Sequence, residues 1–85
     1  MSTENPNWQI TSAGIYRKFS FHNFSQAFAF MTQVALLAEK YNHHPDWKNS
    51  FKVVEITYFT HDQSAITELD WSMSFRIDKL YTVGR

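Results

Sequence analysis

Near Phe24 the spacing of the apolar residues changes, and this change limits the folds open to the chain. From residue 24 onward, apolar side chains recur every three or four positions, as on the buried face of an amphipathic helix. The segments on either side are rich in β-branched and aromatic residues, which is typical of strands. The helical stripe that we expect to be buried consists of Phe24, Ala27, Phe28, Met31, Val34, Ala35 and Ala38.

The ends of this helix can be predicted from its flanking residues. Asn23 and Gln26 have the spacing of a capping box at the start. The end is expected near Tyr41 or Asn42, because asparagine tolerates the left-handed conformation of a C-terminal cap. Pro45 also disfavours helical geometry at the residue before it. Two histidines therefore follow directly after the helix.

Strands are expected before and after the helix. Residues 8–11 and 15–21 flank the turn sequence 12–14, which predicts a hairpin. Residues 51–60 alternate between two faces and predict one strand, or two if pairing begins as early as Trp47. Thr67 and Asp70 then resemble a second capping box. The second helix carries an apolar stripe made of Ile66, Leu69, Met73, Ile77 and Leu80.

This order predicts an α+β fold with two layers. An antiparallel sheet would carry both helices on one face, in the order strand, strand, helix, one or two strands, helix. With 85 residues and no linker, residues 1–85 form one expected domain, of which 1–7 are expected to be disordered. Aromatic residues make up 18% of the chain, more than so small a core would cover, so we expect a homo-oligomer.

Charge and cysteine content exclude several classes of protein. Eight basic and eight acidic residues cancel without forming a basic cluster, so no direct nucleic-acid partner is expected. No run of 18 apolar residues occurs, so no membrane partner is expected. The chain has no cysteine, whereas small secreted domains usually need disulfides, and no apolar leader is evident. A cytoplasmic location is therefore expected.

Three of the four histidines, His43, His44 and His61, lie at predicted segment ends, where sites tend to be built. Imidazoles exchange protons near neutral pH, so the group suits acid-base catalysis. Glu39 could reach the same site and orient an imidazole. Two alternatives stay open: the histidines could only cap the helix and end a strand, or the three could bind zinc.

The motif that contains these histidines resembles a known family. Glu39, His43, His44, Pro45, Phe51, His61 and Asp70 have the residue types and spacings of the pterin-4a-carbinolamine dehydratases. Residues outside the motif also match that family, from about Trp8 to Tyr81. The resemblance implies an α+β fold with the order β-β-α-β-β-α, which agrees with the order above, and a homodimer or homotetramer.

The resemblance also implies an activity, that of a hydro-lyase acting on a 4a-hydroxytetrahydropterin to give a quinonoid dihydropterin, as in tetrahydrobiopterin recycling. It implies no metal and no cofactor, because the pterin itself supplies the electrons. Animal members of the family also serve as dimerisation cofactors of a homeodomain transcription factor. A non-catalytic pterin-binding or assembly role on the same fold is therefore the alternative.

The roles of individual residues follow from the same resemblance. His43 and His61 would transfer protons, while His44 would bind and orient the pterin and could exchange roles with them. Glu39 and Asp70 would be supporting carboxylates. The expected pterin-binding residues are His44, Pro45, Trp47 and Thr60.

Overall fold

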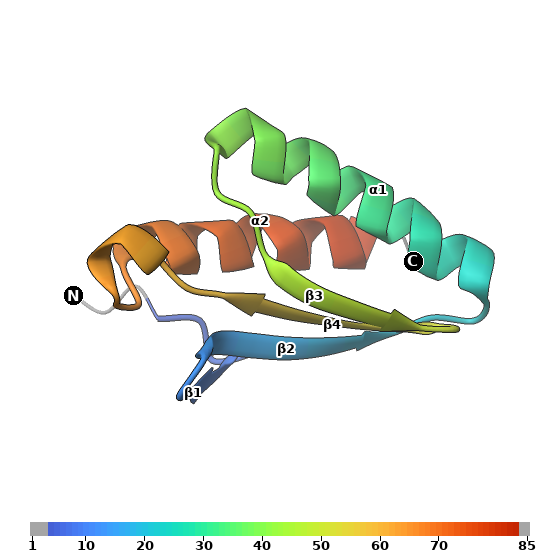
Figure 1. The fold of residues 1–85 in the computed structure, drawn as a ribbon. Coiled ribbons are helices and arrows are strands. Elements are labelled where there is room, and N and C mark those ends of the chain that lie inside the picture. Colours follow the sequence, from blue (N-terminus) through green and yellow to red (C-terminus); the bar gives the residue numbers. More distant parts are fainter. Residues whose placement is uncertain (1–3, 84–85) are drawn as a thin grey trace.

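In the computed structural model, which describes residues 4–83, two helices cover one face of a four-stranded antiparallel sheet (Figure 1). Along the sheet the strand order is β1-β2-β4-β3. The α+β fold and its β-β-α-β-β-α order are thus confirmed. The chain forms β1 (Gln9–Thr11), β2 (Gly14–Ser20), α1 (Phe24–Tyr41), β3 (Asp46–Ser50), β4 (Val53–Tyr58), the short 3-10 helix η1 (His61–Gln63) and α2 (Glu68–Val83).

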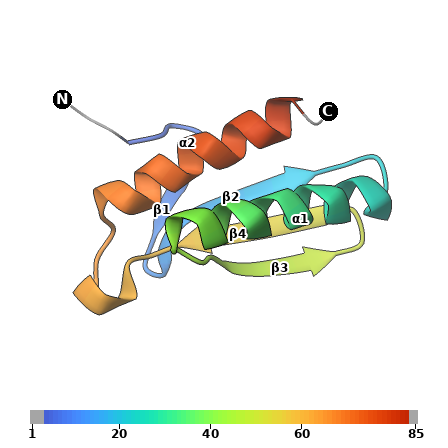
Figure 2. The ribbon, with the colours of Figure 1, turned by 90° about the horizontal axis from the view of Figure 1, so that it is seen from above.

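The central strands β2 and β4 carry the middle of the core. Ile15 of β2 pairs with Tyr58 of β4. Both are fully buried, as are Phe19, Val54 and Ile56 on the same face of the sheet. Seen from above, α1 lies over β4 and α2 lies toward β2 (Figure 2). The end of α1 and the end of β4 are therefore close together, and the predicted site residues follow these two ends.

The segment 51–60, which predicted one or two strands, belongs to a second hairpin. β3 pairs with β4 from Asp46 opposite Thr57 to Ser50 opposite Val53. Phe51 takes a left-handed conformation in the turn, with φ at 54°. The Asn49 side chain holds this turn closed by donating hydrogen bonds to the carbonyl oxygens of Phe51 and Val53. The sequence pattern missed the turn because the residues on both sides of it favour strands.

The turn of the first hairpin requires glycine at position 14. Gly14 has φ at 135°, and a Cβ atom there would lie 2.3 Å from the Tyr58 carbonyl oxygen. A larger residue would push β2 away from β4 at the strand end that leads to the candidate site.

Both predicted ends of α1 are confirmed. The Asn23 side chain accepts a hydrogen bond from the Gln26 backbone N–H at 2.9 Å. The Gln26 side chain reaches back to the N–H of His22, one residue before the partner that a capping box predicts. Asn42 ends the helix in the left-handed conformation, with φ at 52°.

The buried face of α1 differs in part from the predicted stripe. Ala27, Val34 and Ala38 are buried as expected, but Phe24 and Phe28 are 47% and 55% exposed and Ala35 is also exposed. Phe30, which the stripe omitted, is buried because its ring packs on Phe19, with 4.9 Å between the ring centroids. The helix carries two apolar stripes, and contact with the sheet decides which one is buried.

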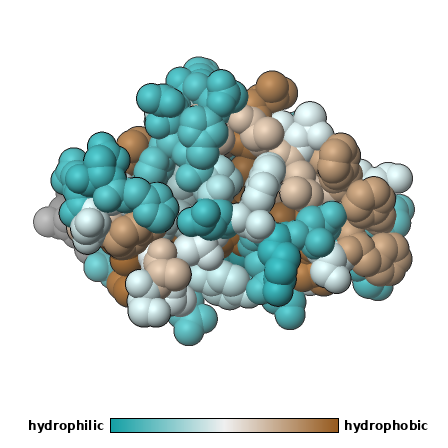
Figure 3. Space-filling model, in the orientation of Figure 1, coloured by the Kyte–Doolittle hydropathy of each residue, from teal (hydrophilic) through white to brown (hydrophobic). Residues whose placement is uncertain are grey.

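These exposed side chains form part of an apolar surface. Figure 3 shows brown side chains gathered at the end of the molecule where α1 begins. The large exposed hydrophobic residues are Ile10, Phe24, Phe28, Leu36, Trp47, Phe51, Leu69 and Phe75. None of the helices within residues 4–83 combines the length and the apolar character needed to cross a membrane.

The buried face of α2 contains polar residues that the apolar stripe did not predict. Met73 and Ile77 are buried as expected, whereas Leu69 is 38% exposed. Asp70 and Ser74 are fully buried on the same face. Partners on the N-terminal segment and on the loop after β4 allow this burial, because a buried polar group needs a hydrogen bond.

The N-terminal segment differs from the disorder that we expected for residues 1–7. Residues 1–3 lie outside the described part, but Asn5 is 2% exposed and packs on α2. Asp78 holds this segment, since its carboxylate accepts hydrogen bonds from the side chains of Asn5, Asn7, Trp8 and Arg17. Asp78 of α2 therefore supplies most of the hydrogen bonds that hold this segment, and Ser74 accepts one more from Asn5.

Asp78→Ala is expected to lower the free energy of unfolding by about 2–4 kcal/mol, because it leaves several partly buried donors without an acceptor. Urea denaturation at matched protein concentration measures this change. Asp62→Ala, which removes an exposed carboxylate in η1, is the control and should change the free energy of unfolding by less than about 0.5 kcal/mol. Equal effects of the two substitutions would contradict the role given to Asp78.

Candidate active site

The C-terminal end of α1 turns His43 into the protein and leaves His44 at the surface. The His43 N–H donates to the carbonyl oxygen of Ala38 at 3.0 Å, and the Asn42 N–H donates to that of Glu39 at 3.3 Å. This pattern, with a left-handed residue at position 42, is a Schellman-type helix end. The side chain of His43 is 11% exposed and that of His44 is 54% exposed. Adjacent histidines thus occupy different environments.

His43 is paired with Asp70, the first buried acid of α2. The His43 Nε2 and Asp70 Oδ1 atoms lie 2.5 Å apart, and the Asp70 side chain is completely buried. A carboxylate oxygen accepts, so Nε2 carries the proton in this contact. In the neutral imidazole the other ring nitrogen, Nδ1, then holds a lone pair and can accept a proton.

The second oxygen of Asp70 is held by the segment after β4. Oδ2 accepts hydrogen bonds from the Thr60 hydroxyl and from the Thr67 N–H, both at 2.8 Å. The Thr67 contact is one half of the capping box predicted for the second helix. The Thr60 and Thr67 hydroxyls also lie 2.7 Å apart. Thr60, expected to bind pterin, is thus buried with its hydroxyl on Asp70.

Glu39 contacts the second histidine of the pair. Its Oε2 atom lies 2.6 Å from Nε2 of His44, and both side chains are more than half exposed. A hollow of about 210 Å³ opens beside this contact. It is lined by Ala35, Ala38, Glu39, His44, Pro45 and Trp47, so two expected pterin-binding residues, Pro45 and Trp47, lie next to His44.

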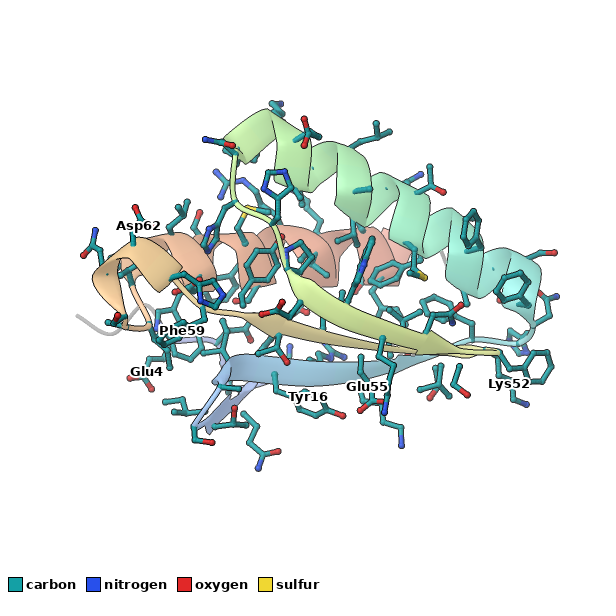
Figure 4. The ribbon with its side chains drawn as sticks, in the orientation of Figure 1. Glu4, Tyr16, Lys52, Glu55, Phe59 and Asp62 are labelled. Atoms are coloured by element: carbon teal, nitrogen blue, oxygen red, sulfur yellow. The ribbon has the colours of Figure 1, made fainter. Side chains whose placement is uncertain are left out.

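His61 approaches from the loop after β4. It begins η1, its side chain is 71% exposed, and its Nε2 atom lies 3.5 Å from Oδ2 of Asp46. Its ring also contacts that of Phe59, labelled in Figure 4, at 5.2 Å between centroids. Paired backbone hydrogen bonds between Thr60 and Ala65 close this loop. Asp46 was not predicted as a site residue, although its place two positions after His44 was a usable signal.

Neighbouring positions in the chain relate the contacts of the three histidines. Thr60, next to His61, contacts the carboxylate that holds His43. Asp46, two residues after His44, contacts His61. Each of these imidazoles therefore has its own carboxylate partner, so the group can hold and move protons. Within residues 4–83, which include all four histidines, no group of three or more His, Cys, Asp or Glu side chains is placed to hold a metal ion.

A buried tyrosine at the end of β4, which the motif does not include, also contacts the site. The Tyr58 hydroxyl donates to the His43 carbonyl oxygen at 3.0 Å, and the two rings lie 5.0 Å apart between centroids. Burial, and then the charge of Asp70, raise the pKa of the Tyr58 phenol above its usual value, so it stays a donor. The sequence signal for this contact was the place of Tyr58 on the alternating face of the strand, because a phenol buried there needs a hydrogen-bond acceptor.

Comparisons with known proteins agree with the motif. A family model described as pterin 4 alpha carbinolamine dehydratase matches residues 1–80. A protein of Prochlorococcus marinus (strain MIT 9215), named "Putative pterin-4-alpha-carbinolamine dehydratase", is 51% identical over 76 residues, which are 89% of this chain and 79% of the relative. A relative of the same name from Mesorhizobium japonicum is 47% identical over 77 residues, which are 88% of this chain and 79% of the relative's length.

Two solved structures are similar to this fold. A crystal structure described as a transcriptional coactivator/pterin dehydratase from Brucella melitensis has a TM-score of 0.85 and 41% identity, covering 89% of this chain and 83% of that one. A pterin dehydratase-like protein described as a RuBisCO assembly factor in the alpha-carboxysome has a TM-score of 0.72 at 24% identity. The match covers 87% of this chain and 86% of that one. The second likeness concerns the fold alone.

Proposed function

This chain belongs to the pterin-4a-carbinolamine dehydratase family, and from that premise we propose that it is a hydro-lyase that converts a 4a-hydroxytetrahydropterin into a quinonoid dihydropterin. In this reaction the C–O bond at the 4a carbon breaks and the hydroxyl leaves as water after it takes up a proton. An adjacent ring nitrogen loses its proton, and the electron pair of that N–H bond forms the new C=N bond. No outside oxidant or reductant is needed.

The observation that carries the proposal is the pairing of each motif histidine with a carboxylate. We assign His43 as the base, because its Nε2 donates to Asp70 and leaves the Nδ1 lone pair for the ring proton. We assign His61 as the acid that protonates the departing hydroxyl, because it is exposed beside Asp46 and can exchange protons with solvent.

We propose that His44, Pro45 and Trp47 bind the pterin. The hollow is lined by the Trp47 indole and by His44, which Glu39 holds, and this mixture of an aromatic and a polar ring suits a flat polar ligand. Thr60 is reassigned from pterin contact to support of Asp70, since its hydroxyl is already engaged there. The chemistry requires no further cofactor, since the pterin nitrogen supplies the electrons.

The test is the dehydration of a 4a-hydroxytetrahydropterin made in situ by a phenylalanine hydroxylase and followed by ultraviolet absorbance. Addition of this protein should accelerate the step above its spontaneous rate. No acceleration by folded wild-type protein would reject the dehydratase proposal.

His44→Ala is expected to weaken pterin binding more than it slows the chemical step. The His44 imidazole lines the proposed binding hollow at the surface, whereas His43, whose side chain is 11% exposed, is the proposed base. Loss of a hydrogen bond to the ligand should raise KM by about tenfold with a smaller change in kcat. Steady-state kinetics separate the two constants. Unchanged KM with much slower turnover would mean that the two histidines exchange roles.

A second candidate is a pterin-binding or assembly protein without turnover. The exposed Phe24, Phe28 and Leu36 on α1 favour it, because such side chains usually contact another chain. The same side chains support a homodimer or homotetramer for the enzyme as well. The cytoplasmic location stays a prediction.

A further inference from the structure

The geometry points to Tyr58 as a positioning residue that holds His43 where α1, β4 and α2 meet. This inference rests on the proposed function, because it concerns how the proposed base is kept in place. Tyr58 is the last residue of β4 and is fully buried. No role in the site was expected for it from the motif.

His43 is held at three points, one from each neighbouring element. Its N–H donates to the carbonyl oxygen of Ala38 in α1. Its Nε2 lies against Asp70 in α2. Its carbonyl oxygen accepts from the Tyr58 hydroxyl in β4. Without the third contact, the backbone at residue 43 is held only from α1, and the imidazole can rotate about a less fixed Cα.

The ring of Tyr58 adds a second restraint. It lies against the His43 imidazole with 5.0 Å between centroids and 36° between ring planes, so it limits rotation of that side chain. Burial raises the pKa of the phenol, so at neutral pH the hydroxyl keeps its proton and remains a donor. Within residues 4–83 the hollow beside Pro45 and Trp47 is lined without Tyr58, whose hydroxyl donates to the His43 carbonyl oxygen, so its effect should pass through His43.

Tyr58→Phe isolates the hydroxyl, because it keeps the ring in the core and removes only the contact to the His43 carbonyl oxygen. Tyr16→Phe is the matched control. The Tyr16 hydroxyl makes a single hydrogen bond of 2.7 Å to Glu55, and Figure 4 shows both residues below the sheet, on the face without helices. Each variant therefore loses one phenolic hydrogen bond, but only one of the two bonds reaches His43.

The experiment measures kcat and KM for 4a-hydroxytetrahydropterin dehydration, together with the imidazole ¹⁵N chemical shifts of His43 in the free protein. For Tyr58→Phe we expect kcat to fall about tenfold with KM within about twofold, because a displaced proton acceptor slows transfer without removing the binding surface. The His43 nitrogens should also change their shifts. Tyr16→Phe should leave both readouts unchanged.

Unchanged His43 nitrogen shifts in Tyr58→Phe would overturn the inference, as would unchanged kcat in an active enzyme or an equal loss of kcat in Tyr16→Phe. If the wild-type protein does not accelerate dehydration, the proposed function fails, but the nitrogen shifts still decide whether Tyr58 positions His43. The two failures can therefore be told apart.

Discussion

Replacement of His43 by alanine is expected to lower kcat for dehydration by roughly 100-fold or more, because it removes the proposed proton acceptor. The fold should survive, since the backbone contacts of residue 43 to Ala38 and Tyr58 do not use the imidazole. Replacement of His61, the proposed acid, should cause a loss of similar size. Steady-state kinetics with 4a-hydroxytetrahydropterin measure both variants, and circular dichroism checks their folding.

His22→Ala is the matched control for these variants. His22 is exposed and precedes the first turn of α1, whereas His43 follows its last turn. The 18 residues of α1 separate these two ends by about 27 Å. The control should keep wild-type kcat. Wild-type turnover in both His43→Ala and His61→Ala would remove the basis for histidine catalysis in this protein.

The second large effect is expected from Asp70→Asn, which replaces the carboxylate behind His43 by an amide of nearly the same shape. The amide oxygen can still accept from Thr60 and Thr67, which places the NH₂ group toward Nε2 of His43. Nε2 must then accept, and the proton moves to Nδ1, the atom that we propose as the base. We expect kcat to fall roughly 100- to 1,000-fold, by analogy with wrong-tautomer variants of other histidine enzymes.

Stability should change less than turnover in this variant. Loss of a charge-assisted hydrogen bond in a buried network is expected to lower the free energy of unfolding by about 1–3 kcal/mol. Asp62→Asn, an exposed acid of η1, is the control and should leave both quantities unchanged. If Asp70→Asn turns over within twofold of wild type, the carboxylate does not set the His43 tautomer.

Much of the fold could be predicted because local sequence decides it. Asn23 and Asn42 mark the ends of α1 through hydrogen-bonding and backbone preferences of their own. The alternation of Val54, Ile56 and Tyr58 fixed one buried face of β4, and all three are buried. The sequence pattern did not predict the hairpin turn at Phe51, because strand-favouring residues continue through it.

The buried face of each helix was harder to predict. Phe24, Phe28 and Phe30 are chemically alike, but only Phe30 lies where the Phe19 ring can receive it. On α2, Asp70 and Ser74 interrupt the apolar stripe that spacing predicts. Their burial depends on partners from residues far away in sequence, and no local pattern contains those partners.

The sequence by itself determined the order of strands and helices, the ends of α1, and the presence of three histidines and two acids with the spacing of a family motif. Helix caps and strand alternation depend on neighbouring residues, so they can be read along the chain. Only the tertiary structure decided which carboxylate faces which imidazole. It pairs Asp70 with His43, Glu39 with His44 and Asp46 with His61, and it adds the Tyr58 contact. The physical reason is that three of these four contacts, all but the one between Glu39 and His44, need the packing of α1, β3, β4 and α2 to bring distant residues within hydrogen-bond distance.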